Sequence, residues 1–240
     1  MSQFSGPLGI LGEIPFSTDS TASTNTLGVV LPADNNRRFV YVKNGATAIT
    51  VRGTMYQGPA QDTAHQDLAV AAAAIGDKTI VTTTTVTVTA NQYAGGFAVI
   101  SVTPGVGQYF KIKSHAAATG AVVTLNLEDP IKVALTTASR VDLVPNVYNG
   151  VVVAPATLTG TVVGVVVNPI AANSYGWLQN WGPAPVIADV GGALTVDDAI
   201  SASNQTAGTV EVGVAGQPNL GYAMSGVAAG ETGLAFLRIG

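Results

Sequence analysis

The sequence predicts an all-β protein in which an extended N-terminal arm precedes β-sandwich-like or barrel-like domains of short antiparallel strands. Three observations predict this class. Runs of β-branched residues recur along the chain, as in "IVTTTTVTVTA" and "VVGVVV". Gly, Pro and Asn punctuate these runs at intervals of about 8–12 residues, a spacing typical of small sandwiches and barrels. No long amphipathic period of 3.6 residues is present, so we expect at most one short helix.

Residues 1–30 are the predicted arm. They combine Gly and Pro with apolar residues that follow neither a helical nor a strand period, and they end in a Ser/Thr/Asn tract. Such a segment cannot build its own core, so it stays disordered or lies on another surface. Six large apolar side chains favour docking, for example against another subunit, and are candidate interface residues. These are Phe4, Leu8, Ile10, Leu11, Ile14 and Phe16.

Residues 31–145 are expected to form a β-rich domain. Its first part, residues 37–57, alternates in hydrophobicity on both sides of Asn44-Gly45, which predicts a β-hairpin with a tight turn. Residues 146–240 are expected to form a second, smaller β-barrel or sandwich, because short apolar runs and turn residues alternate throughout them.

Residues 62–75 fit either a helix or a strand. Thr63 and Gln66 have the spacing of a capping box, and an Ala run follows them. Leu68 and Val70 instead alternate as in a strand, and "IGDKT" fits a turn. The β signals on either side favour strand–turn–strand.

The Thr/Val run at 81–89 predicts a strand without any charge. Its alternation places Thr82, Thr84, Val86 and Val88 on one face and the remaining threonines on the other. β-branched side chains suit a pleated surface, and a threonine-rich face can meet solvent or a neighbour.

The composition indicates a protein that assembles with others. Only 10% of residues are charged, whereas about 25% is usual, and the mean hydropathy is +0.38. A surface covered by neighbours explains this, because interface cores are depleted in charge; a monomer solubilised by hydroxyls and amides is the alternative. We expect a homo-oligomer, with a trimer as the working guess.

Charge and apolar runs also predict which partners are absent. Residues 141–240 hold one basic residue, Arg238, against six acidic ones, and Arg37-Arg38, Lys111 and Lys113 are too scattered to track phosphates. No apolar run reaches the ~20 residues of a membrane helix. We therefore expect no nucleic-acid partner and no membrane partner. The first residues lack the pattern of a secretory signal, which predicts a protein made in a cytoplasm that stays, at least at first, in the cell that makes it.

No pattern in the sequence predicts catalysis, and we expect no enzyme, catalytic residue, metal or cofactor. The chain has no Cys, and His65 and His115 lack ligand spacing, so surface or turn positions are expected for both histidines. Asp197-Asp198 is the best carboxylate pair, but neighbours on a strand point to opposite faces. We expect a solvated turn there; a cleft that joins Asp197 to another carboxylate would instead indicate a hydrolase.

Both tryptophans lie in "YGWLQNW". Tyr175, Trp177 and Trp181 share one strand face by parity. They fit a core plus subunit interface, where Trp and Tyr are enriched, and they are candidate interface residues. A carbohydrate-stacking platform is the alternative.

Several phrases resemble virion structural proteins of tailed bacteriophages. These phrases are "NNRRFVYVKNGATAITVRGTMYQ", "NQYAGGFAVI", "GQYFKIKSH", "LNLEDPIKVALTTASRVDLVPNVYNGVV", "AANSYGWLQNWGPAPVIAD" and "AGETGLAFLRIG". They span most of residues 35–240, and the resemblance is to capsid decoration, or cement, proteins. It implies a β-rich protein on the capsid surface of the virion that binds the major capsid protein and stabilises the shell. It carries no catalytic residues. The alternative is a head-fibre or tail-fibre module that recognises host surface glycans.

Overall fold

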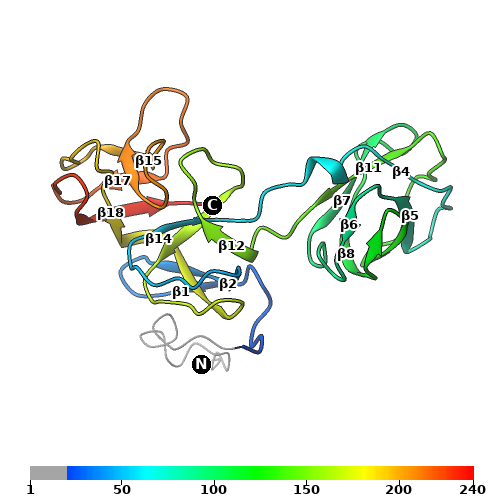
Figure 1. Ribbon diagram of the computed structural model, residues 1–240, viewed down its shortest axis with the longest axis horizontal. Helices are drawn as coiled ribbons and strands as arrows, with labels where there is room; N and C mark the ends of the chain where they lie inside the picture. The colour runs from blue at the N-terminus through cyan, green and yellow to red at the C-terminus, as the bar shows by residue number, and fades with distance from the viewer. Residues whose placement is uncertain (1–20) are drawn as a thin grey trace, which may run out of the picture. The chain divides into compact units, whose positions relative to one another are not determined.

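The computed structural model describes residues 21–240, which fold almost entirely into β-strands with one 3₁₀ turn at Thr63–His65. The predicted all-β class is therefore confirmed. The arm residues from Phe4 to Phe16 lie outside the described residues. The chain divides into two compact units (Figure 1). Unit 1 contains residues 21–59 and 147–240, and unit 2, Ala60–Asn146, is inserted between them.

This division differs from the expected one. The expected boundary at 145/146 lies beside the end of unit 2, but residues 31–59 belong to unit 1 and not to the domain that follows them. The reason is strand pairing at long range: the strands at 38–44 and 55–57 pair with strands beyond residue 148.

Unit 1 is built from one ten-stranded sheet. Its strands are β1 (Val30–Pro32), β2 (Arg38–Asn44), β3 (Met55–Gln57), β12 (Asn149–Val153), β13 (Val162–Val166), β14 (Tyr175–Ile187), β15 (Ala199–Ala202), β16 (Val210–Val212), β17 (Gly221–Ala223) and β18 (Thr232–Arg238). The long strand β14 serves two closed rings of strands, one with each half of its length.

The first module is the ring β2-β12-β3-β13-β14, which closes because the first half of β14 pairs with β2. The second module is the ring β14-β16-β15-β17-β18, in which the second half of β14 pairs with β18. It closes through a parallel bridge from Ala188 to Val210. Figure 1 shows β14, β18 and β17 side by side.

The two modules have the same strand order, the same pairing directions and the same register. The parallel pair Asn44–Val151 of the first module corresponds to Ala188–Val210 of the second. The bridge Ile49–Ile170 likewise corresponds to Leu194–Val227. Unit 1 is thus an internal structural repeat, although the sequence shows no exact repeat.

Each module encloses apolar side chains. The first module holds Val40, Val42, Val151, Val166 and Leu178. The second holds small residues such as Ala184, Ala188, Ala223 and Ala235 around Ile200 and Leu237. Met55 and Val165 lie on strands of the first module but pack into the core of the second, which is separate from the core of the first.

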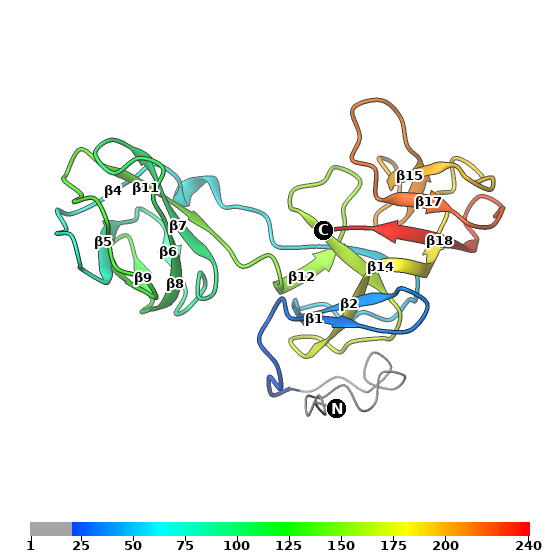
Figure 2. The same ribbon diagram turned by 180° about the vertical axis from the view of Figure 1, so that it is seen from behind.

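Unit 2 is a separate β-barrel-like body. Its strands are β4 (Leu68–Ala69), β5 (Thr79–Thr83), β6 (Thr87–Val88), β7 (Phe97–Val102), β8 (Tyr109–His115), β9 (Ala118–Thr119), β10 (Val122–Leu127) and β11 (Arg140–Val144). Six of them form a sheet in the order β4-β11-β7-β8-β10-β5, and β6 pairs with β9. Figure 2 shows β4, β11, β7 and β8 within this body. A bridge from Val70 to Thr82 brings the chain after β4 back to β5. A core of buried apolar residues, including Ile80, Ile112 and Leu143, fills the interior.

The hairpin predicted at 37–57 is wrong. β2 and β3 do not pair with each other, because β12 lies between them. Asn44 and Gly45 also lack the positive φ that a two-residue hairpin turn needs.

The ambiguous residues 62–75 contain a single 3₁₀ turn followed by β4. The N-cap is Asp62, whose carboxylate accepts a hydrogen bond from Ala64 N, and not Thr63. The strand–turn–strand interpretation of the remainder is confirmed, because β4 is followed by a turn at Ile75-Gly76 and then by β5.

Candidate interaction surface

The three predicted aromatic residues all lie on the outer side of β14, but the structure distributes them over two surfaces. Tyr175 and Trp177 pack against Tyr41 of β2, with ring centroids 6.0 and 5.1 Å away. Phe39 and Val167 complete this cluster. Trp177 is only 8% exposed, so it is a buried packing residue and not an open platform.

A segment of the chain itself covers this first cluster. Leu27, Leu31 and Ala33 pack on it, and the segment is held as a strand along β2. Tyr41 N donates to Val29 O (3.0 Å), and Gly28 N donates to Tyr41 O (2.8 Å). The outer face of the first module is therefore covered within unit 1.

Trp181 belongs to a second surface, the outer face of β14, β18 and β17 in the second module. We call it the proline–aromatic face, and the strand register arranges it in rows. One row is Arg38, Trp181 and Arg238; the next is Pro183, Phe236 and Tyr222; the third is Pro185, Leu234 and Met224. The rings of Tyr222 and Phe236 stack in parallel at 5.3 Å, and Trp181 meets Phe236 edge to face at 6.1 Å.

No described segment covers the proline–aromatic face in the way that residues 27–33 cover the first cluster. Leu234 is 42% exposed and Met224 is 40% exposed. The prolines, Phe236 and Tyr222 are half-buried by their neighbours on the sheet. Exposed apolar patches of this kind are typical of interaction sites, and Trp, Tyr and Arg are enriched where such sites bind tightly.

Two arginines border the face. The Arg38 guanidinium lies 4.9 Å from the Trp181 ring, and that of Arg238 lies 5.0 Å from the Tyr222 ring. Neither forms an ion pair with a carboxylate within residues 21–240. The Trp181 indole N–H and the Asn180 side-chain oxygen are shielded from solvent and, in the same part of the chain, have no hydrogen-bond partner. The two guanidinium groups at the border of the face can therefore receive negative charge.

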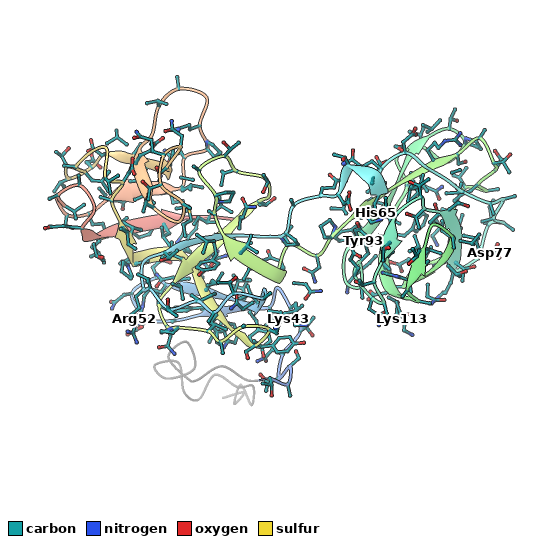
Figure 3. All side chains as sticks on the ribbon, viewed as in Figure 1. Lys43, Arg52, His65, Asp77, Tyr93 and Lys113 are labelled. Carbon is teal, nitrogen blue, oxygen red and sulfur yellow. The ribbon has the colours of Figure 1, made fainter. Side chains whose placement is uncertain are left out.

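The expectation that the histidines lie at the surface is wrong. His65 and His115 of unit 2 are 0% and 4% exposed and converge on Tyr93, which is 1% exposed; Figure 3 shows His65 beside Tyr93. Tyr93 Oη lies 2.6 Å from His65 Nδ1. The backbone N–H of Tyr93 donates to His115 Nε2 (3.0 Å).

Hydrogen bonding assigns roles within this cluster. His115 Nδ1 lies 3.0 Å from Ala116 O, so Nδ1 carries the proton and Nε2 accepts. Burial, with the nearby Asp62 carboxylate as a second cause, raises the pKa of Tyr93 to about 12. His65 Nε2 has no partner within residues 21–240. The cluster is enclosed, and it locks the segment around Tyr93 into the barrel.

The carboxylates of residues 21–240 form no convergent site. Asp197 adopts a φ of 74° in a turn, and the Asp198 carboxylate accepts hydrogen bonds from the backbone N–H and hydroxyl of Thr195. These bonds lower the pKa of Asp198. A cavity of about 270 Å³ lies beside Asp189 and Glu211. Hydrogen bonding, first of all from Thr206, lowers the pKa of Asp189 and ties its carboxylate to the surrounding loop.

Among residues 21–240 no group of three or more His, Asp or Glu side chains is placed to hold a metal ion. No helix in the same range is both long and apolar enough to cross a membrane.

Sequence reasoning found Trp181 but missed the other residues of the proline–aromatic face. A signal was present: in "WGPAPVI" and "TGLAFLR" larger apolar residues alternate with small ones. The small residues fill the second module, which turns the larger ones outward. Only the three-dimensional strand pairing reveals that the two segments with this alternation lie side by side.

Comparison with family profiles, curated proteins and solved structures finds no match to this chain.

Proposed function

We propose that this chain is a structural protein of a tailed-bacteriophage virion. It binds the outside of the capsid and stabilises it by bridging neighbouring major capsid protein subunits, with the capsid surface as its location. The observation that carries the proposal is the proline–aromatic face: an apolar surface that residues 21–240 leave uncovered, bordered by two arginines without an ion pair in that range, on a chain with only 10% charged residues. The resemblance of its sequence segments to decoration proteins suggests the major capsid protein as the partner.

Apolar burial explains how such a protein would stabilise a shell. Each square ångström of apolar surface removed from water contributes about 25 cal/mol before the entropic cost of association. A ligand that binds only the assembled shell stabilises it by about 2.7 kcal/mol at 100 times its Kd. Several copies held together would dissociate more slowly than one copy.

The test is to add purified protein to expanded shells of the virus that encodes it. We expect co-sedimentation and a higher shell melting temperature. Leu234→Asp should weaken both effects, because it places a charge in the middle of the face. Val214→Asp is the matched control, since Val214 is 61% exposed in the same module but outside the face. Absence of binding, together with absence of the chain from virions by mass spectrometry, would refute the proposal.

A fibre or adhesion module that binds host glycans is the second candidate. The adjacent, half-buried rings of Trp181, Phe236 and Tyr222 favour it, because sugars stack on aromatic rings. Trp177 contributes nothing to such a platform, since residues 27–33 cover it. Glycan-array binding that is lost in Trp181→Ala, without any shell binding, would support this candidate instead.

A further inference from the structure

The internal repeat shows what covers an outer face of this kind. Strand register makes Phe39, Tyr41, Val167 and Trp177 of the first module equivalent to Pro183, Pro185, Met224 and Leu234 of the second. In the first module these positions lie under Leu27 and Leu31. In the second module they form the open centre of the proline–aromatic face.

The second module cannot be covered in the same way. The first is covered by a strand that pairs with β2 through Tyr41 N, and the equivalent position in β14 is Pro185. Proline has no backbone N–H, so it cannot make that bond. Pro183 O already accepts a hydrogen bond from Gln179 Nε2 (2.7 Å). A covering segment must therefore pack its side chains on the face without extending the sheet.

The N-terminal residues of this chain have the composition that such packing needs. Residues 4–16 contain six large apolar residues, and Pro7 and Pro15 make them unsuited to a continuous strand. The charged residues between 1 and 20 are Glu13 and Asp19, both acidic. They complement Arg38 and Arg238 at the border of the face.

The distance along the chain also fits. Thr24 Oγ1 lies 3.1 Å from Tyr41 Oη, and the Tyr41 ring touches Trp177. From Trp177 to Pro183, β14 advances six residues, about 20 Å. The eight residues from Thr24 to Phe16 can span up to about 28 Å. The start of the chain is therefore long enough to reach the face of its own molecule, where the effective concentration of a tethered segment is in the millimolar range.

We propose that residues 4–16 cover the proline–aromatic face of the same molecule when the protein is free. Phe and Leu/Ile side chains of this segment pack on Pro183, Phe236 and Leu234, and Glu13 faces the arginines. A partner that uses the face must first displace the segment. This covering takes place in the free protein, so it does not depend on whether the protein binds a capsid.

Trp181 fluorescence tests this in the absence of any partner. In Trp177→Phe, Trp181 is the sole tryptophan. Deletion of residues 2–16 from this variant should raise the acrylamide quenching constant roughly twofold, because quencher then reaches the uncovered face. Far-UV circular dichroism checks that folding is retained. An unchanged quenching constant in the folded deletion variant would overturn the proposal.

Cysteine pairs provide a second measurement that requires no deletion, because the natural chain has no cysteine. Leu11→Cys with Leu234→Cys should form an intramolecular disulfide on mild oxidation at micromolar protein. Leu11→Cys with Val214→Cys is the matched control and should form much less. Predominantly intermolecular disulfides would place the segment on a second copy, and equal yields for the two pairs would indicate no docking; either result contradicts the proposal.

Discussion

At the scale of single residues, the most constrained group is the buried cluster of His65, Tyr93 and His115. Every described polar atom of Tyr93 has a partner: its hydroxyl meets His65, and its backbone N–H donates to His115. Buried polar groups are tolerated when they are bonded in this way and costly when one partner is removed. The histidines therefore stabilise unit 2 through Tyr93.

Tyr93→Phe is expected to lower the free energy of unfolding of the protein by about 1–3 kcal/mol, because it removes the hydroxyl partner of the buried His65 Nδ1 and leaves that atom only the longer contact to Asp62 Oδ2 (3.4 Å). The measurement is urea unfolding monitored by circular dichroism. Tyr109→Phe is the control: Tyr109 is 69% exposed in the same unit, so a change within about 0.5 kcal/mol is expected. Equal effects of the two substitutions would show that the hydroxyl bond contributes nothing.

Single residues were predictable from sequence where the cause is local. Thr82, Thr84 and Val88 share a face in the predicted alternation and are all buried, but the predicted single strand is wrong: β5 ends at Thr83 and β6 is Thr87–Val88. Val86 departs, at 36% exposed, because the Thr84 hydroxyl bonds Val86 O and N and turns the chain. The histidines were missed because their common partner, Tyr93, lies more than 20 residues from each, and spacing along the chain carries no trace of that contact.

At the scale of strands and their connections, the two modules of unit 1 repeat the same structural solutions. Residues 164–179 and 221–236 align without a gap, and both carry Gly, Ala-Ala and Gly at corresponding positions. The first glycine of each segment, Gly164 or Gly221, lies against a backbone carbonyl of the neighbouring strand. A Cβ on Gly164 would lie 2.6 Å from Gln179 O, and one on Gly221 would lie 2.0 Å from Phe236 O. The weak sequence repeat therefore reflects a shared close approach of strands.

Gly164→Ala tests this close approach. The added methyl group must push β13 away from β14, and overpacking of this type costs about 1–3 kcal/mol. Gly192→Ala is the matched control, because a Cβ there meets no atom within 4 Å. Thermal unfolding of both variants gives the comparison; a Gly164→Ala protein as stable as the Gly192→Ala protein would contradict the steric argument.

Elements were predictable in type and less so in pairing. The β runs occur where hydrophobic alternation and turn residues placed them, but Asn44-Gly45 predicted a hairpin that does not form. Local turn chemistry was overruled there by β12, which inserts between β2 and β3 from about 90 residues further along the chain. The proline–aromatic face also depends on pairing at long range, because it forms only when β14, β18 and β17 lie side by side. Of its residues, only Trp181 was predicted from the sequence.

At the scale of the whole molecule, the repeat explains where unit 2 enters the chain. In the second module, β15 and β16 are joined by the short loop Ser203–Thr209. The equivalent strands of the first module are β3 and β12, and the whole of unit 2 lies between them. A domain has thus been accommodated in one loop of a repeated module. Surface loops tolerate such insertions when their ends lie close together.

The ends of this insertion do lie close together, since a Cβ on Gly58 would lie 2.6 Å from Val147 O. Replacing residues 60–146 by a two-residue Gly-Ser linker leaves seven residues between Gly58 and Val151, as many as Ser203–Thr209 contains between the equivalent positions Ala202 and Val210. Because unit 1 has its own cores and unit 2 has a separate one, we expect both the shortened chain and isolated residues 60–146 to fold.

Cooperative thermal unfolding and dispersed NMR spectra of each part are the readouts. The shortened chain, which contains only unit 1, also tests the functional proposal, because it retains the proline–aromatic face and the N-terminal residues. If the face attaches the protein to shells, the shortened chain should bind them and Leu234→Asp within it should weaken binding. A shortened chain that folds but does not bind would transfer the attachment function to unit 2.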